Sequence, residues 1–187
     1  MNTRDKLIDI GEGLIRCRGY DGFSFADLAR ESGIRKASVH HHFATKADFG
    51  LAVLIRYGER LRALLNMFAN SRSGGQALLK LIAFYREMLS DGDHLCLCVA
   101  LAGDRTVLSE RLHAVLAQTN AATASWIESV LLTGRKDRSI SVGGDPAEEA
   151  WAILAQLQGA QLLARAAGDL TQFDVAVATL LTRLNRY

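Results

Sequence analysis

Hydrophobic residues recur every three or four positions along most of the chain, the spacing that gathers them on one face of an α-helix. The pattern predicts helices over Thr3–Arg18, over two short stretches at 25–32 and 36–42, and over a long stretch that begins after Thr45. Further helices are expected over 76–90, 95–103, 107–132, 146–167 and 171–186, with loops at 70–75 and 133–144. No stretch alternates as a strand does, so we expect an all-α fold of about nine helices.

The segment 24–46 contains two short helical patterns joined by a glycine, which is the layout of a helix-turn-helix. Ser24 is suited to cap the first helix, with Asp27 at the third helical position to complete a capping box. Gly33 is able to adopt the left-handed conformation that ends this helix. The second helix buries Val39 and exposes basic, imidazole and hydroxyl groups, and an exposed helix of that size fits the major groove of DNA.

The same region resembles the DNA-binding domain of the TetR family of repressors. The resemblance is carried by Gly19-Tyr20-Asp21-Gly22-Phe23-Ser24, Asp27-Leu28-Ala29, Gly33-Ile34, Ser38-Val39, His42-Phe43 and Lys46. Phe23 replaces a hydroxyl residue of the family, and His40 stands where the family has a Tyr that often touches the DNA backbone. The resemblance implies an N-terminal helix-turn-helix head of three helices over 1–47 and a C-terminal helical bundle for ligand binding and dimerisation over 48–187.

Two later segments look like one branch of that family, the branch whose repressors answer to electrophiles such as N-ethylmaleimide or acrylate. These segments are Cys96-Leu97-Cys98 and Gln158-Gly159-Ala160-Gln161-Leu162-Leu163-Ala164-Arg165. The resemblance therefore implies a small-molecule effector that is recognised by the C-terminal bundle.

The formal net charge of +2 is too small to indicate nucleic-acid binding by itself. The distribution of charge says more, because Arg30, Arg35, Lys36 and Lys46 face only Glu31 over the stretch 30–46. Such a concentration on one element is the electrostatic feature expected of a protein that binds a DNA groove.

The ends and the apolar runs of the chain bear on its compartment. A charged N-terminus leads directly into an amphipathic helix, and no run of about 18 apolar residues is present, so we expect neither a signal peptide nor a membrane span. The expected location is the cytoplasm, where the three cysteines are not expected to form structural disulfides.

His40, His41 and His42 do not predict a metal site, because consecutive helical residues point about 100° apart and cannot converge on one ion. Cys96 and Cys98 allow three interpretations: buried packing residues, an electrophile or redox sensor, or ligands of a metal together with His94. If a thiol is reactive, Cys96 is expected to be the one, because it lies near the start of its helix, where the helix dipole stabilises a thiolate.

No nucleophile with a base and an orienting group stands out, and no glycine loop suited to phosphates is present, so we expect neither an enzyme nor a cofactor. The leading hypothesis is a ligand-responsive transcriptional repressor that binds an inverted-repeat operator as a homodimer. The alternative is a cytosolic helical thiol-dependent enzyme or electrophile scavenger.

The repressor hypothesis assigns residues to three surfaces. DNA contacts are expected from Ser24, Arg35, Lys36, Ala37, Ser38, His40, His41, His42 and Lys46, with Lys36, His40 and His41 reaching base edges. The effector pocket is expected to be lined by Tyr85, Met88, Cys96, Gln118, Trp126, Gln156, Leu157 and Gln161. The dimer is expected to form through the last two long helices, with apolar surface from Trp151, Leu154, Leu157, Leu162, Phe173, Val177, Leu180 and Leu184.

Overall fold

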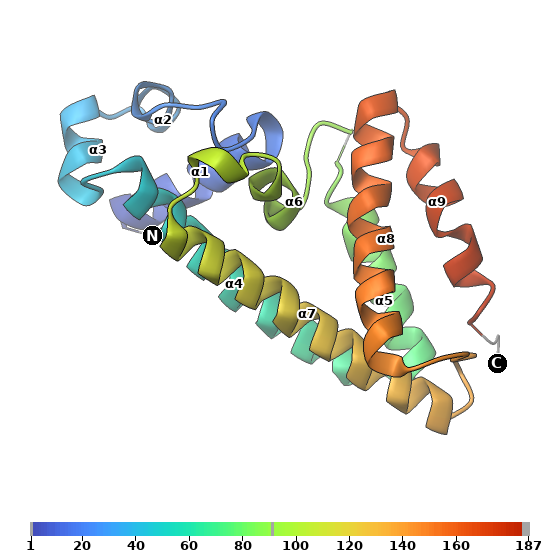
Figure 1. Cartoon of the computed structure of the whole chain (residues 1–187). Helices are drawn as coiled ribbons and strands as arrows, with labels where there is room; N and C mark the ends of the chain where they lie inside the picture. Colours follow the sequence, from blue (N-terminus) through green and yellow to red (C-terminus); the bar gives the residue numbers. More distant parts are fainter. Residues whose placement is uncertain (1, 91, 185–187) are drawn as a thin grey trace. The chain divides into compact units, whose positions relative to one another are not determined.

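The computed structural model describes residues 2–90 and 92–184, and within these ranges it is built from nine α-helices and one short 3-10 helix (Figure 1). The elements are α1 (Thr3–Arg18), α2 (Phe25–Ser32), α3 (Lys36–His42), α4 (Lys46–Ala69), α5 (Gly74–Glu87), α6 (Leu97–Ala102), η1 (Arg105–Val107), α7 (Glu110–Lys136), α8 (Pro146–Ala167) and α9 (Thr171–Leu181). The predicted all-α fold is thereby confirmed. None of these helices is both long and apolar enough to cross a membrane.

Helices with strong capping residues begin and end where the sequence predicts. Ser24 forms the capping box with Asp27 at the start of α2, and Gly33 ends that helix with φ of 75°. Asp145 caps α8 through two backbone amides, and Gly168 ends α8 in the left-handed conformation. Each of these residues satisfies helix-end groups that would otherwise lack partners, which is why such ends can be read from sequence.

Several predicted helix boundaries are wrong. Helix α5 begins at Gly74 rather than 76, because Ser73 caps it, and it ends at Glu87 rather than 90. Helix α7 begins at Glu110, after η1, and continues to Lys136, beyond the predicted end at 132. Helix α9 ends at Leu181, and the last part of the helix predicted to reach 186 lies outside the described residues.

The chain forms two compact units. The first comprises Met1–Glu59 with Leu97–Thr119, and the second comprises Arg60–Cys96 with Asn120–Tyr187. The first unit therefore contains the helix-turn-helix together with α6, η1 and the beginning of α7.

The core of the first unit is a cluster of aromatic rings around Phe49, which is fully buried. The ring centroids of Phe23, Phe25 and Phe43 lie 5.8, 5.8 and 4.9 Å from that of Phe49. Because these rings come from the turn before α2, from α2 itself and from the end of α3, Phe49 holds the helix-turn-helix on α4.

In the second unit, α8 and α9 pack against each other, and both contact α5. The packing buries Leu154 and Leu157 of α8 and Phe173, Val177 and Leu180 of α9. These five residues are therefore part of the subunit core and not of an exposed dimer surface as predicted. The large apolar residues that do remain exposed on these two helices are Trp151, Leu162, Leu163, Val175 and Leu181.

Candidate nucleic-acid interface

Helix α3 presents a polar surface to solvent while one residue fixes it to the head. Val39 is fully buried, whereas the residues in and beside this helix that are predicted to contact DNA are not. Arg35, Lys36, Ala37, Ser38, His40 and His41 are exposed, and His42 is half-buried. The helix is thus supported from one side and free to enter a groove with the other.

The three histidine rings have different surroundings. The ring of His40 lies edge-on to Phe25 of α2, with centroids 5.0 Å apart. The rings of His41 and His42 lie edge-on to each other, with their centroids 5.6 Å apart. His40 is therefore held against α2, and this contact gives it a packing role in addition to the base contact predicted for it.

Ser24 and Lys46 are already engaged within the head. The Ser24 hydroxyl donates to Asp27 Oδ2 at 2.6 Å, and this bond is the first cause of a lowered pKa of Asp27. The Lys46 ammonium donates to the Phe23 carbonyl at 2.6 Å and lies over the Tyr20 and Phe23 rings. Burial lowers the pKa of Lys46, and the carboxylates of Asp21 and Asp104 act in the opposite direction. A phosphate contact by Lys46 stays a prediction, and it would require the ammonium to be shared with Phe23.

Sequence reasoning missed two residues that hold the turn between α1 and α2. Asp104, which follows α6, accepts hydrogen bonds from the backbone amides of Tyr20 at 2.5 Å and Asp21 at 3.3 Å. The Tyr20 hydroxyl donates to the Lys46 carbonyl at 2.9 Å, and burial raises the pKa of Tyr20 to about 12, with Asp48 adding to the rise. No local pattern indicates the bond between Asp104 and Tyr20, because the two residues are 84 positions apart.

Three of the residues predicted to line an effector pocket are brought together in the second unit. Gln161 is fully buried, and its side chain accepts a hydrogen bond from the Cys96 amide at 2.9 Å and donates one to the Tyr85 carbonyl at 2.6 Å. Tyr85 belongs to the last turn of α5, where carbonyl groups run out of helical partners. Gln161 therefore ties the end of α5 to the segment that leads into α6.

The remaining candidates for that pocket lie in different surroundings. Met88 and Leu157 are buried, and Trp126 is half-buried with an indole N–H that has no partner among the described residues. Gln156 instead donates to the Ala176 carbonyl of α9 at 2.7 Å. Gln118 is exposed and belongs to the first compact unit. Of the predicted polar anchors, only Gln161 is thus fully enclosed in the second unit.

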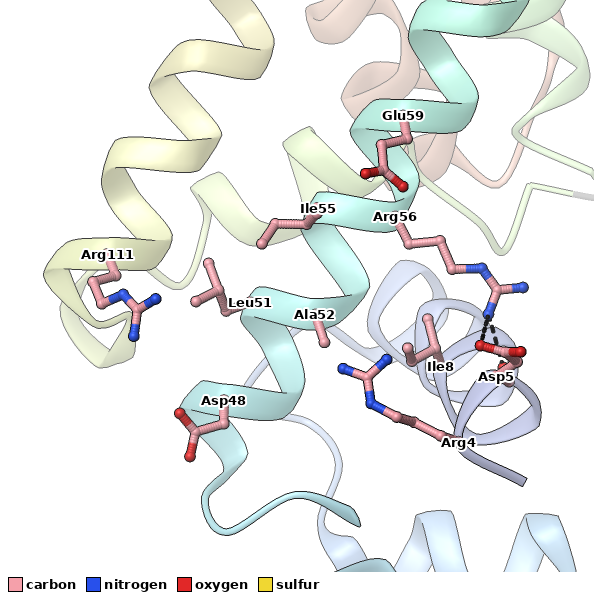
Figure 2. A pocket seen from close by; sticks show the side chains of 10 residues that line it. All are labelled: Arg4, Asp5, Ile8, Asp48, Leu51, Ala52, Ile55, Arg56, Glu59 and Arg111. Carbon is pink, nitrogen blue, oxygen red and sulfur yellow. Dashed lines mark hydrogen bonds and ion pairs between the residues drawn. The ribbon is translucent and has the colours of Figure 1, made fainter. Parts of the chain in front are cut away.

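A pocket of about 440 Å³ lies in the first unit, between side chains of α1, α4 and α7 (Figure 2). It is lined by Arg4, Asp5, Ile8, Asp48, Leu51, Ala52, Ile55, Arg56, Glu59 and Arg111. Its cations are partly neutralised, since Arg56 pairs with Asp9 at 2.8 Å and with Asp5 at 3.7 Å. The Arg4 guanidinium lies 5.1 Å from the centre of the Phe43 ring. The pairs of Arg56 join α1 to α4, and the ring contact of Arg4 joins α1 to the residue that ends α3.

Comparisons with known proteins agree with this geometry. Residues 7–53 match the model of the bacterial regulatory proteins of the tetR family. The transcriptional repressor NemR of Escherichia coli K12 is 27% identical over 187 residues, which cover 95% of this chain and 91% of that protein. A helix-turn-helix-type transcriptional regulator of Mycobacterium tuberculosis is 31% identical over 180 residues, covering 92% and 89% of the two chains. The solved structure of a TetR-family regulator from Agrobacterium tumefaciens is 28% identical and superposes with a TM-score of 0.91 over 98% of this chain and 97% of that one.

These relatives are named as transcriptional regulators and not as enzymes, so the alternative of a thiol-dependent enzyme finds no support among them. The match of the head, the similarity over nearly the whole chain and the exposed polar face of α3 lead to the same conclusion. The chain belongs to the TetR family and is a DNA-binding transcriptional regulator.

Proposed function

We propose that the protein is a cytoplasmic, ligand-responsive repressor that binds an inverted-repeat operator as a homodimer. The observation that carries the proposal is the arrangement of α3, which buries Val39 and exposes Lys36 and His41 together with neighbouring polar residues. The name of the Escherichia coli relative as a repressor supports the direction of regulation. Residues 1–47 would form the DNA-binding domain, and residues 48–187 the ligand-binding and dimerisation domain.

On DNA, Lys36, His40 and His41 would contact base edges, with Arg35 beside them. Ser38 and His42 would contact the phosphate backbone, which positions the head without reading sequence. Ser24 and Lys46 would approach the backbone at the ends of α2 and α4, and Ala37 would allow close approach because of its small side chain. Two such heads, one from each subunit, would occupy successive major grooves about 34 Å apart.

The homodimer would form through α8 and α9. Leu163 is 60% exposed and Val175 is 68% exposed, so each of these two helices keeps a large apolar side chain that a partner subunit would cover. Two helices from each subunit would make a four-helix bundle, in which the same surface of each subunit contacts itself. That two-fold arrangement matches an inverted-repeat operator.

The effector would bind within the second compact unit, near Tyr85, Cys96 and Gln161. Two buried nitrogen atoms in this unit, Trp126 Nε1 and His94 Nδ1, have no hydrogen-bond partner among the described residues. Buried polar atoms are rarely left without partners, so these two are candidates for contact with a ligand. A small, mostly apolar molecule with a hydrogen-bond acceptor would suit the indole N–H.

The test begins with selection of bound sequences from random duplex DNA. The double variant Lys36→Ala with His41→Ala should remain folded and lose roughly 1–3 kcal/mol of operator binding for each specific base contact. A variant with Lys80→Ala and Lys136→Ala, two exposed cations on α5 and α7, controls for the loss of charge and should bind nearly as the parent does. Operator binding by the α3 variant equal to that of the control would show that α3 is not the reading helix. Small molecules are then screened for release of the selected DNA.

A further inference from the structure

The turn between α1 and α2 is held by a carboxylate from a distant part of the chain. The Asp104 carboxylate accepts hydrogen bonds from the backbone amides of Tyr20 at 2.5 Å and of Asp21 at 3.3 Å. The carboxylate lies very close to the turn, since a Cβ atom on Gly19 would lie 2.9 Å from Asp104 Oδ2. Gly19 also has φ of 79°, a backbone conformation that other residues rarely adopt. The chain thus brings the carboxylate directly onto the turn.

The same turn is held from its other side by the first residue of α4. The Tyr20 hydroxyl donates to the Lys46 carbonyl at 2.9 Å, and the Lys46 ammonium donates to the Phe23 carbonyl at 2.6 Å. Lys46 follows α3 by only a few residues, so these bonds connect the turn before α2 with the start of α4, directly after the helix that faces DNA. Asp104 and Lys46 together fix the backbone from Tyr20 to Phe23.

The position of this turn bears directly on the reading helix. It leads into Ser24, the cap of α2, and α2 packs against α3. The turn has little rigidity of its own, because Gly19 and Gly22 flank it and glycine restricts the backbone least. The direction of α2, and through it that of α3, therefore depends on contacts that reach the turn from outside. These are the bonds of Asp104 and Lys46 together with the packing of Phe23 against Phe49.

We propose that Asp104 is a positioning residue for operator binding: its carboxylate fixes the turn before α2 and thereby holds α3 at the angle that suits the major groove. The inference rests on the proposed function, because it assigns Asp104 to the same DNA-binding event. It goes beyond that function because it gives Asp104 a role through the turn and not through a DNA contact. Operator affinity becomes dependent on the segment between α6 and η1, which the first compact unit contains.

The sign of the effect separates this proposal from simple electrostatics. Removal of a negative charge from a DNA-binding unit ordinarily strengthens binding to phosphates. Removal of the Asp104 charge should instead weaken operator binding, because the turn loses its partner. Asp104→Ala removes both hydrogen bonds and is expected to weaken operator binding about tenfold or more. Asp104→Asn retains an oxygen that can accept from Tyr20, so it should weaken binding less.

The experiment measures three proteins against the parent, with the operator selected from random duplex DNA and with an unrelated duplex of the same length. Asp104→Ala and Asp104→Asn are compared with Glu110→Gln, which removes an exposed negative charge from the same compact unit. Amide hydrogen exchange at Tyr20 and Asp21 is recorded for each protein, well below its unfolding temperature. We expect faster exchange at these amides, weaker operator binding in the order parent, Asn, Ala, and unchanged binding to the unrelated duplex. Glu110→Gln should bind operator as well as the parent or slightly better.

Two results would overturn the proposal. The first is operator affinity equal to that of the parent in both Asp104 variants. The second is a parallel loss of affinity for operator and unrelated DNA, which would indicate a general loss of folded protein. If Asp104→Ala does not fold, Asp104→Asn provides the same comparison. A parent protein that selects no DNA sequence would refute the proposed function, whereas a parent that selects an operator and variants that bind it equally well would refute this inference alone.

Discussion

Two glycines of α1 offer a test in which the same substitution has opposite consequences. A Cβ atom on Gly11 would lie 2.1 Å from Cζ and 2.5 Å from Cε1 of Phe49, whereas a Cβ atom on Gly13 would meet no atom within 4 Å. Phe49 is fully buried between the rings of Phe25 and Phe43 and has little space to move away. Gly11→Ala should therefore force the aromatic cluster apart, while Gly13→Ala adds a methyl group to open space.

The magnitudes follow from two separate effects. Replacement of glycine by alanine inside a helix stabilises it by about 0.5–1 kcal/mol, and both variants share this gain. Insertion of a methyl group into a packed core costs about 1–3 kcal/mol, and only Gly11→Ala carries this cost. The difference between the two variants isolates the steric cost, so Gly13→Ala should be more stable than Gly11→Ala by about 1–3 kcal/mol.

Urea unfolding at one fixed protein concentration measures this difference, and the concentration must be fixed because dimerisation contributes to apparent stability. In thermal unfolding each kcal/mol should appear as a shift of about 2–4 °C for a chain of this size. Equal stability of the two variants, or a more stable Gly11→Ala, would refute the reasoning that Phe49 is rigidly held.

Three further predictions concern the second unit and its surfaces. Gln161→Leu should lower the free energy of unfolding, measured by urea unfolding, by about 2–4 kcal/mol, because the Cys96 amide and the Tyr85 carbonyl both lose a buried hydrogen bond. Gln156→Leu, at a half-buried site, is the control and should lower it less. Leu163→Glu should raise the dimer dissociation constant in sedimentation by about tenfold or more, and Leu79→Glu, on an exposed site of α5, is the control that should leave it unchanged. The two thiols beside α6 are both buried, so labelling by N-ethylmaleimide should be slow at each. Cys96 should still react before Cys98, because it precedes the helix while Cys98 lies within it; peptide mapping that finds Cys98 labelled first would contradict this.

The helix ends that were predictable from sequence are those where one residue satisfies its own neighbours. Ser24 with Asp27, and Asp145 with the two amides that follow Pro146, act over three positions or fewer. Such short-range hydrogen bonds are visible in the order of residues alone. The helix-turn-helix was predictable for the same reason, since its caps, its turn glycine and its periodicity all lie within one short segment.

Two misplaced boundaries, the start of α5 and the end of α7, have a different cause, namely glycines that serve tertiary packing. Gly74 and Gly134 suggested loops, yet both are helical. A Cβ atom on Gly74 would lie 2.4 Å from the Gly134 backbone nitrogen, and one on Gly134 would lie 2.4 Å from Ile140. These glycines permit a close approach between α5, α7 and the segment after α7. A sequence pattern does not distinguish a glycine needed for close approach from one that ends a helix.

The exposed apolar residues of α8 and α9 were only partly predictable, because helical periodicity does not tell which of two apolar faces is covered within the subunit. Leu157 and Phe173 fit the predicted surface by their spacing, yet both are fully buried against other helices of the same chain. Trp151 and Leu162 were assigned correctly to the exposed part of α8, whereas the exposure of Leu163 and Val175 emerges only from the packing.

The segment from Cys96 to Asp104 forms hydrogen bonds at both ends with residues that lie far away in sequence. At one end the Gln161 side chain accepts a hydrogen bond from the Cys96 amide, and at the other the Asp104 carboxylate accepts hydrogen bonds from two amides of the turn before α2. The first bond belongs to the second compact unit and the other two belong to the first, so the chain between them, which includes α6, passes directly from one unit to the other. Each bond is made by a single side chain, and each can be removed without altering the other. Gln161→Leu and Asp104→Ala therefore separate the two contributions: the first should act on stability, and the second on operator affinity. If the bonds at the two ends of the segment act independently, the effects of the two substitutions on operator affinity should be additive. A departure from additivity in the double variant would measure the coupling free energy between the two ends.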